Sequence, residues 1–209
     1  LYHNNGQFIP TLIPLVLGHS TTTIKPLSGL LQFIKVLKKF KINYTSVMAT
    51  HINYLISIKK KYKLDTLKEI YCGGAKLDPN TQKIFEKKYK VKILANYGLT
   101  ECSSIASTET GKVRKLGSVG KPLDNNLIKI SKKKINYGEI LIKGNNIFKE
   151  YLSNKKLTNK KVINNYLYTG DKGYFDTNGH LFIEDRIDNM INVSGENIYP
   201  SEIEKYTNN

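Results

Sequence analysis

Helix and strand patterns alternate along roughly the first 110 residues, and this alternation restricts the possible folds more than any other feature. Short apolar runs typical of strands lie at 44–49, 70–72 and 91–95. Before and between them lie stretches whose apolar residues are spaced as on one helical face: Leu30, Leu31, Ile34, Leu37 and Phe40, then 52–58, then Ile84, Phe85 and Tyr89. Strands that alternate with helices predict a parallel sheet covered by helices.

Two signals mark where helices begin. Ser28 stands before the first helical pattern and is a residue type that caps helix starts. Asp78 is followed by Pro79, so a capping side chain comes directly before a proline at the first helical position, where the missing N–H costs no hydrogen bond. We therefore expect helices to begin after Ser28 and after Asp78.

The pattern changes after residue 110. Short apolar runs at 127–130, 139–142, 166–169 and 180–184 are separated by turns rich in Gly, Asn and Asp, which is typical of a mainly β, barrel-like subdomain. The Lys- and Asn-rich stretch 153–165 is predicted to be an exposed connection, and 201–204 a helix start. The expected fold class is α/β: a parallel sheet with flanking helices (1–110), then a β-rich subdomain (111–185), then a short tail (186–209).

The charge balance is typical of nucleic-acid-binding proteins, with 33 Lys and Arg against 17 Asp and Glu and a net charge of +16. Only Arg114 and Arg186 are arginines, although the planar guanidinium is the group best suited to bases and phosphates. Lys, Asn and Ile together make up 76 of the 209 residues, as AT-rich codon usage would produce. We interpret the lysines as solvated and expect no specific nucleic-acid partner. A non-catalytic basic fragment that binds nucleic acid remains the alternative.

Cys72 and Cys102 are the only cysteines. Two are too few for a disulfide scaffold and match no metal-ligand spacing, which favours a reducing compartment and a cytoplasmic location. No apolar run approaches the roughly 20 residues of a membrane span, so no transmembrane segment is expected. The chain opens LYHN, without Met or an apolar leader, so we expect no signal peptide and a start inside a larger protein.

Two strand patterns end in glycine-containing turns, CGGA at 72–75 and NYGLTE at 96–101. Open α/β sheets bind ligands at the carboxyl ends of their strands, and glycine lets the backbone approach a ring or a phosphate closely. Tyr97 can stack on a base, the Thr100 hydroxyl can donate to a phosphate, and the Glu101 carboxylate can hold Mg²⁺. A tight turn in which Tyr97 only packs is the alternative.

A carboxylate and an arginine follow in the β-rich stretch. Asp171 ends the run YTGD at 168–171, where its side chain could bind two vicinal ribose hydroxyls, or could simply belong to a Gly-Asp turn. Arg186 lies in DRIDNMI at 185–191, in a chain that otherwise uses lysine almost everywhere. A site that needs the bidentate guanidinium fork explains why an arginine stands there.

In this order and spacing, the segments resemble the adenylate-forming superfamily, which includes acyl-CoA synthetases, luciferases and the adenylation domains of peptide synthetases. The resemblance covers essentially the whole chain. It includes YHNNGQ at 2–7, similar to a His-x-Asn-Gly segment of acyl-CoA ligases, and GSVGKP at 117–122, similar to the Gly-Ser-x-Gly-x-Pro turn of the superfamily.

The resemblance implies a site for ATP and Mg²⁺. The adenine slot would be formed by Gly73, Gly74, Ala75, Asn96, Tyr97 and Gly98. Thr100 would contact the phosphates and Glu101 would bind the Mg²⁺ that bridges to ATP, which makes both residues catalytic candidates. Asp171 and Arg186 would hold the ribose hydroxyls.

Further positions carry implied roles outside the nucleotide site. Asp188 would be the hinge between a large amino-terminal region and a small carboxy-terminal domain, of which 186–209 would be the start. Ser194, Gly195 and Glu196 would lie near the pantetheine of CoA. His3 would lie beside the acyl pocket, or be a structural histidine.

The implied activity is that of an acyl-CoA synthetase: a carboxylic acid, fatty-acid-like, is activated by ATP as an acyl-adenylate and then transferred to CoA. The segment NVSGENIYP at 192–200 resembles the CoA-ligase branch; a peptide-synthetase adenylation domain is the alternative. The superfamily's Gly-rich phosphate loop and its catalytic lysine find no counterpart here. We therefore expect a fragment of an active parent protein, and we expect the 209 residues to be inactive alone.

Overall fold

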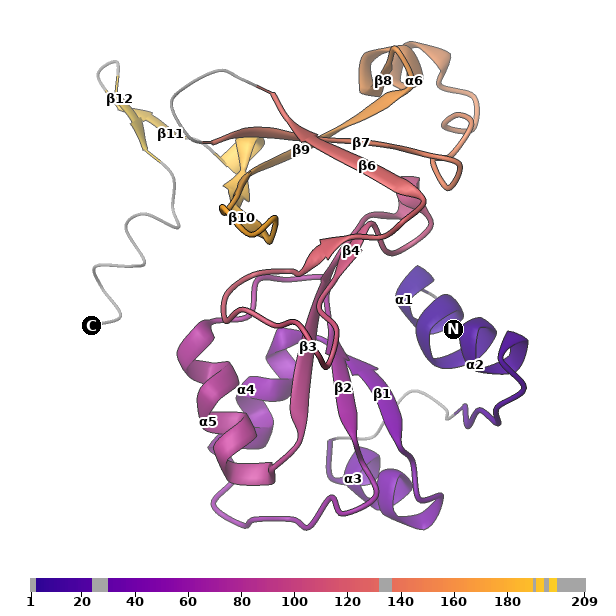
Figure 1. Cartoon of the computed structure of the whole chain (residues 1–209), viewed down its shortest axis with the longest axis vertical. Coiled ribbons are helices and arrows are strands. Elements are labelled where there is room, and N and C mark those ends of the chain that lie inside the picture. Colours follow the sequence, from indigo (N-terminus) through magenta and orange to yellow (C-terminus); the bar gives the residue numbers. More distant parts are fainter. Residues whose placement is uncertain (1–2, 24–29, 132–136, 190, 194–195, 199–209) are drawn as a thin grey trace.

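The first half of the chain forms a five-stranded sheet with strand order β1-β2-β3-β4-β5 (Figure 1). The computed structural model describes residues 3–23, 30–131, 137–189, 191–193 and 196–198. The first three strands are parallel, and the last two are added antiparallel. The bounds are β1 (Tyr44–Val47), β2 (Glu69–Cys72), β3 (Lys92–Tyr97), β4 (Ser107–Thr108) and β5 (Lys121–Pro122). The predicted parallel sheet is confirmed.

Three helices pack with this sheet: α3 (Leu30–Lys39), α4 (Ala49–Ser57) and α5 (Pro79–Tyr89). Figure 1 shows α4 and α5 side by side against the sheet. Phe85, Ile70 and Ile93 are fully buried in the shared core. Helix α5 begins where the sequence predicts, because the Asp78 side chain accepts a hydrogen bond from the Thr81 N–H at 2.7 Å.

Two apolar positions were predicted wrongly. Ile84 is 52% exposed, and Gln82 is buried in its place with its Nε2 donating to the Ile93 carbonyl at 3.2 Å. Residues 82, 85 and 89 share one helical face, whereas Ile84 lies about 100° away from Phe85. Phe40 is 50% exposed because α3 ends at Lys39. Ser28 and the side chains of Leu30 and Leu31 lie outside what the structure describes.

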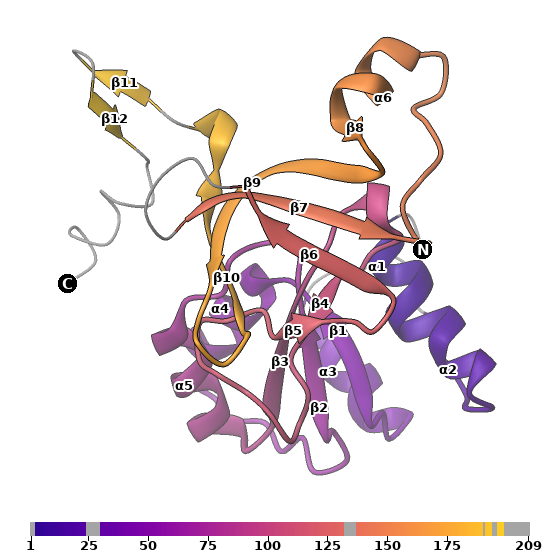
Figure 2. The same ribbon diagram turned by 45° about the horizontal axis from the view of Figure 1, so that its top comes forward.

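A second, antiparallel sheet follows, with strand order β10-β9-β7-β6 and β8 paired to β9. Its inner face carries the buried residues Ile128, Ile140, Ile142, Leu167 and Leu181. Figure 2 shows this sheet curling over the end of the first one, in agreement with the predicted barrel-like subdomain. The bounds are β6 (Asn126–Ile130), β7 (Gly138–Gly144), β8 (Val162–Ile163), β9 (Tyr166–Phe175) and β10 (Leu181–Arg186).

The stretch 153–165 is more than the exposed connection that its lysines suggested. It contains helix α6 (Lys155–Lys161) as well as β8. The Asn154 side chain caps α6 by accepting from the Leu157 N–H at 3.0 Å, and Thr158 turns inward and is buried. Because α6 buries only one hydroxyl-bearing side chain and is otherwise rich in lysine, its sequence has almost no periodic pattern of apolar residues. The sequence analysis therefore did not predict this helix.

The two sheets meet through a short contact that we call the seam, made by Val119, Gly120 and Leu181. The Val119 N–H donates to the Leu181 carbonyl at 2.9 Å, and the Leu181 N–H donates to the Gly120 carbonyl at 2.8 Å. Gly120 has φ +79°, and a Cβ there would collide with the backbone of Thr108 in β4. The predicted domain boundaries at 110 and 185 remain predictions.

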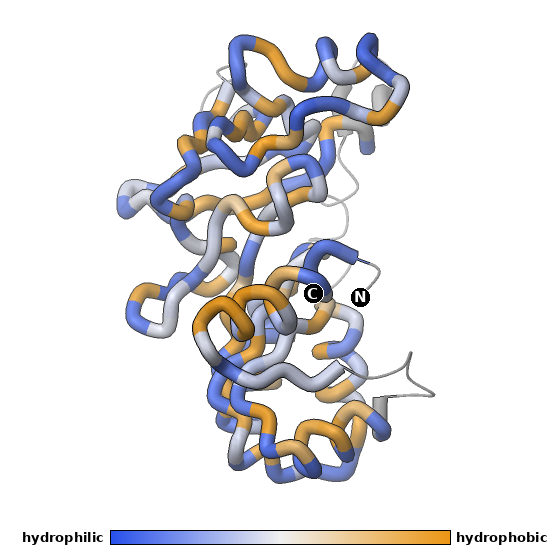
Figure 3. Tube along the Cα trace, turned by 90° about the vertical axis from the view of Figure 1, so that its right-hand side faces the viewer, coloured by the Kyte–Doolittle hydropathy of each residue, from blue (hydrophilic) through white to orange (hydrophobic). Residues whose placement is uncertain are grey.

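The chain begins with a helical segment that the sequence analysis did not assign: α1 (Asn4–Gln7), the π-helix η1 (Phe8–Leu12) and α2 (Ile13–Val16). Figure 3 colours this segment largely orange, and its residues 12, 13 and 15–17 are exposed apolar side chains. The remaining elements are η2 (Thr100–Cys102), η3 (Ile187–Asn189) and the hairpin of β11 (Ile191–Val193) and β12 (Glu196–Ile198). The predicted helix start at 201–204 lies outside the described residues.

Within the described ranges, no helix is both long and apolar enough to cross a membrane.

Candidate nucleotide site

Three predicted site residues from three strands lie in direct contact. Tyr97 ends β3, Asp171 lies in β9, and Arg186 ends β10. The Tyr97 hydroxyl donates to Asp171 Oδ2 at 2.6 Å, and Arg186 Nη1 donates to Asp171 Oδ1 at 3.2 Å. Asp171 and Arg186 are cross-strand partners in the antiparallel register of β9 and β10. One carboxylate therefore joins the two sheets across 74 residues of sequence.

The electrostatics of this contact fix the state of Tyr97. Burial, and then the charge of Asp171 and its hydrogen bond, raise the pKa of the Tyr97 phenol well above its usual value of 10.0. The phenol therefore stays protonated at neutral pH and acts as a donor. The Asp171 side chain is buried at 9% exposure, whereas that of Arg186 is 46% exposed. The guanidinium is thus partly exposed to solvent.

The turn after β2 lies close to the end of β3. A Cβ on Gly73 would collide with Oδ1 of Asn96, and Gly74 adopts φ +80° in the same turn. Nδ2 of Asn96 is buried and has no hydrogen-bond partner among the described residues. A buried donor without a partner costs free energy unless a ligand pairs it, so this amide is a candidate ligand contact.

Thr100 and Glu101 lie in the single turn η2 that follows β3. The Tyr151 hydroxyl donates to Glu101 Oε1 at 2.7 Å, and the Phe148 N–H donates to the Glu101 carbonyl at 2.8 Å. Nδ2 of Asn4 reaches the Thr100 carbonyl at 3.4 Å. The turn is therefore held by the loop after β7 and by the N-terminal helix.

A second set of contacts ties the same turn to the β7 loop. The Asn146 Nδ2 donates to the Cys102 carbonyl at 2.8 Å, and the Ser103 hydroxyl donates to the Asn146 carbonyl at 2.9 Å. The sequence analysis assigned no role to Asn146 or Tyr151. Tyr151 lies 50 residues from Glu101 in sequence, and no local pattern connects the two.

The described carboxylates suit a Mg²⁺ ion that is bound together with a substrate better than a metal ion that is held by protein ligands alone. Among the described residues, no group of three or more His, Cys, Asp and Glu side chains surrounds a common point. Mg²⁺ typically binds one or two carboxylates together with substrate phosphates and water. Glu101, in the turn predicted to contact phosphates, is one carboxylate of the kind that this donor set requires.

The other predicted site residues lie apart or outside the described residues. His3 is exposed and stands at the start of α1, directly before Asn4. Asp188 lies in η3 and Glu196 in β12, where only the backbone is described. Ser194 and Gly195 lie outside the described residues. The structure therefore brings together the nucleotide-binding candidates and leaves the CoA candidates untested.

Both cysteine thiols are buried. Burial raises the pKa of Cys72 to about 12 and, as the main cause, that of Cys102 to about 11. Both thiols therefore stay protonated and unreactive at neutral pH.

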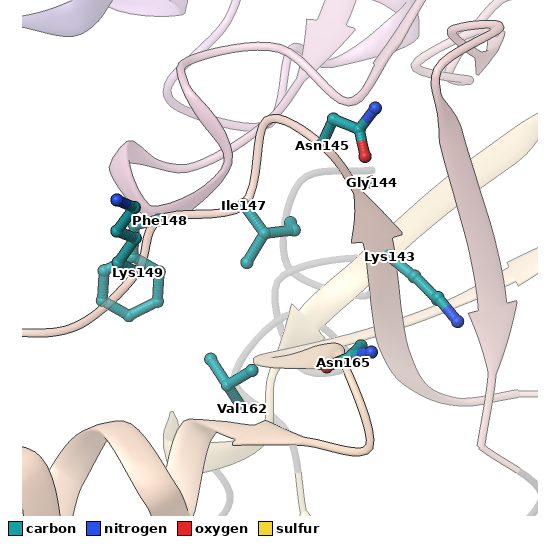
Figure 4. A pocket seen from close by; sticks show the side chains of 8 residues that line it. All are labelled: Lys143, Gly144, Asn145, Ile147, Phe148, Lys149, Val162 and Asn165. Carbon is teal, nitrogen blue, oxygen red and sulfur yellow. The ribbon is translucent and has the colours of Figure 1, made fainter.

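The pocket shown in Figure 4, of about 380 Å³, contains none of the predicted site residues. Ile147 and Val162 point toward its middle, whereas the ammonium groups of Lys143 and Lys149 point away. Its lining is Lys143, Gly144, Asn145, Ile147, Phe148, Lys149, Val162 and Asn165. This pocket therefore lies apart from the candidate nucleotide site.

Comparison with known proteins decides the family. Residues 1–152 match the family model described as AMP-binding enzyme. The chain belongs to the AMP-binding enzyme family. The predicted resemblance to adenylate-forming enzymes is thereby confirmed.

Several relatives are CoA ligases by name. The 2-succinylbenzoate–CoA ligase of Oceanobacillus iheyensis is 34% identical over 225 residues, covering 98% of this chain and 46% of the relative. The probable 4-coumarate–CoA ligase 3 of Dictyostelium discoideum is 29% identical over 215 residues, covering 97% and 39%. This member of the family thus spans less than half the length of these curated relatives.

Solved structures share the fold. The O-succinylbenzoate coenzyme A synthetase of Bacillus subtilis, in complex with ATP and magnesium ion, matches with a TM-score of 0.81 and 27% identity, covering 92% of this chain and 42% of that one. The anthranilate CoA ligase AuaEII, in complex with anthranoyl-AMP, matches with a TM-score of 0.90 and 20% identity, covering 96% and 41%. The latter likeness supports the fold alone.

Proposed function

We propose that this chain carries the nucleotide-binding part of an acyl-CoA ligase, which activates a carboxylic acid with ATP and transfers the acyl group to CoA. The observation that carries the proposal is the contact of Tyr97, Asp171 and Arg186 where the two sheets meet. The similarity to 2-succinylbenzoate–CoA ligases supports it.

The residues present fit a nucleoside. Asp171 offers carboxylate oxygens to the vicinal ribose hydroxyls, with the half-exposed Arg186 fork beside it. The ring nitrogens of adenine are acceptors, and the unpaired Asn96 amide is a buried donor that can meet one of them. Tyr97 and the glycine backbone at 73–74 would enclose the base, with Ala75 and Gly98 continuing the same two turns.

The reaction runs in two displacements. The substrate carboxylate oxygen forms a bond to the α-phosphorus of ATP while the bond to pyrophosphate breaks, which gives an acyl-adenylate. The CoA thiol then bonds to the acyl carbon, loses its proton, and AMP leaves. Thr100 would donate to phosphate oxygens and Glu101 would hold Mg²⁺. When bound, Mg²⁺ neutralises charge that develops on the phosphates.

The finer assignments are part of the proposal. Asp188 would be the hinge, Ser194, Gly195 and Glu196 would border the CoA pantetheine, and His3 would border the acyl group. A fatty-acid-like acid and a cytoplasmic location remain predictions from the sequence. The named relatives take 2-succinylbenzoate and 4-coumarate, so the acid must be found by testing a panel.

The experiment is acid-dependent ATP–pyrophosphate exchange by the gene product that contains this segment, with wild type, Glu101→Gln and the control Glu150→Gln. Glu150 is exposed, and its carboxylate makes no hydrogen bond among the described residues. We expect Glu101→Gln to lower exchange about 100-fold or more, because the lost interaction grows as charge develops. Glu150→Gln should match wild type. Exchange by Glu101→Gln at the wild-type rate would remove Glu101 from the mechanism, and absence of exchange with every acid would contradict the proposed function.

A further inference from the structure

Glu101 lies on a single helical turn, which by itself fixes a side chain poorly. Its backbone is held by the Phe148 N–H, and its side chain makes one described hydrogen bond, from the Tyr151 hydroxyl to Oε1. Among the residues described, no group donates to Oε2. The carboxylate is therefore held at one oxygen and open at the other.

Tyr151 is itself fixed by two contacts. Its backbone N–H donates to the Thr158 hydroxyl at 2.9 Å, and its ring meets that of Phe148 edge to face at 4.6 Å between centroids. Thr158 is buried, and its hydroxyl donates to the Asn154 carbonyl at 3.1 Å. A chain of contacts thus runs from α6 through Tyr151 to the Glu101 carboxylate.

We propose that Tyr151 is a positioning residue for the metal site: its hydroxyl holds Oε1 of Glu101 so that Oε2 is presented to a divalent cation. Partners that orient a ligating carboxylate commonly change metal affinity 10- to 100-fold when they are removed. This inference rests on the proposed function, because it takes Glu101 as the metal ligand.

The test is binding of ATP to the 209-residue chain by calorimetry, first with EDTA and then at increasing Mg²⁺ concentrations. The variants are Tyr151→Phe, Glu101→Gln and the control Tyr54→Phe, whose exposed hydroxyl makes no described hydrogen bond. We expect Tyr151→Phe to need about tenfold more Mg²⁺ for half of the metal-dependent gain in affinity. Its ATP affinity in EDTA should equal that of wild type. Tyr54→Phe should match wild type in both.

The outcomes separate the inference from the proposed function. Suppose that Tyr151→Phe needs the same Mg²⁺ concentration as wild type, while Glu101→Gln loses the effect of Mg²⁺ on ATP affinity. This result would overturn the positioning role of Tyr151 and leave the proposed function intact. Equal loss of ATP affinity with and without Mg²⁺ in Tyr151→Phe would assign Tyr151 to the fold alone and also overturn it. A wild-type chain that does not bind ATP would contradict the proposed function itself.

A second measurement needs neither ATP nor a Tyr151 variant. The ¹³Cζ resonance of Tyr151 at pH 8 reports its hydrogen bond, and Glu101→Gln replaces the charged acceptor. We expect this resonance to shift in Glu101→Gln and to stay in place in Glu150→Gln. An unchanged resonance in Glu101→Gln would show that the two side chains are not coupled in solution, which overturns the inference.

Discussion

The two sheets bury their residues in different ways. In the α/β region (β1–β3 with α3–α5), strand β3 buries Ile93, Leu94, Ala95 and Asn96 in succession, as expected for a parallel strand covered on both faces. In the β region (β6–β10), strand β7 buries Gly138, Ile140 and Ile142 and leaves Glu139 and Leu141 between them partly exposed. Strand β3 is therefore covered on both faces, whereas β7 is covered on one.

This difference assigns separate parts of the candidate site to each region. The α/β region contributes close-packed turns and an aromatic ring, through Gly73, Asn96 and Tyr97. The β region contributes two charged groups, the buried Asp171 and the partly exposed Arg186. The candidate site lies where the two regions meet, so we expect it to depend on the contacts between them as much as on either fold.

The largest expected effect separates the two cores. Phe85 is fully buried in the core that contains Cys72, whereas Cys102 lies in the core of the β region. Phe85→Ala should destabilise the α/β region by about 3–5 kcal/mol. In thiol-alkylation kinetics, this should speed labelling of Cys72 about 100-fold or more and leave Cys102 near its wild-type rate.

The control for that comparison is Ile84→Ala, on the same helix but 52% exposed. It should change stability by no more than about 0.5 kcal/mol. If Phe85→Ala accelerates the labelling of both thiols equally, the two regions unfold as one unit and are not independent in stability.

The next largest effect tests the seam. In Gly120→Ala, a residue with a left-handed backbone carries a Cβ, which should cost about 1–2 kcal/mol of stability. The same Cβ collides with Thr108, which should cost about 1–3 kcal/mol more. Gly179→Ala is the matched control, because Gly179 has φ +78° with open space around its Cβ position. Hydrogen exchange should show lost protection at the Val119 and Leu181 amides in Gly120→Ala alone. Retained protection at both amides would contradict the seam.

A smaller effect is expected at the contact itself. Tyr97→Phe removes the hydroxyl that donates to Asp171 and leaves the Arg186 interaction in place. Loss of a hydrogen bond to a charged group should cost about 1.5–3 kcal/mol of stability, measured by urea unfolding at pH 7. Tyr54→Phe serves as the control on an exposed hydroxyl. Equal midpoints for the two variants would mean that Tyr97 and Asp171 are not paired in solution.

The smallest effect is a pH dependence confined to the β region. The Lys115 ammonium, and the N–H groups of Asn178 and His180, lower the pKa of Asp176 below its usual 3.8. A lowered pKa means that the contribution to stability is present above pH 3.8 and is lost as the pH falls through the folded-state pKa. Asp176→Asn should therefore lower the unfolding temperature slightly at pH 7, and the difference should shrink below pH 3.8. A constant difference down to pH 2 would refute this.

Much of the fold follows from local signals in the sequence. Asp78 and Pro79 predicted the start of α5 to the residue, because a cap and a first-turn proline act within a few residues. The strand runs at 70–72 and 166–169 lie within β2 and β9 for a similar reason. The predictions failed where tertiary packing decides which side chain is buried: on α5, Gln82 is buried and Ile84 is exposed. Helix α6 was missed because its one buried side chain, the hydroxyl-bearing Thr158, gives no periodic pattern of apolar residues.

The site was harder to predict than the fold. Glycine-ended strands and an isolated arginine indicated Tyr97, Asp171 and Arg186, and the resemblance placed them in one nucleotide site. Which of their atoms meet depends on how the second sheet curls over the first. The support of Glu101 by Tyr151 was not predictable, because it joins residues 50 apart through side chains that carry no motif of their own. Sequence patterns show which residues end strands, and tertiary packing decides which of them meet.

The central claim is that Asp171 holds the ribose of a nucleotide where the two regions meet. Its most direct test is the affinity of wild type, Asp171→Ala and the exposed-carboxylate control Asp65→Ala for ATP and for 2′,3′-dideoxy-ATP. Wild type and Asp65→Ala should prefer ATP by about tenfold or more, since hydroxyls bonded to a carboxylate are worth at least about 1.4 kcal/mol. Asp171→Ala should bind the two nucleotides about equally. A preference for ATP that survives in Asp171→Ala would contradict the claim.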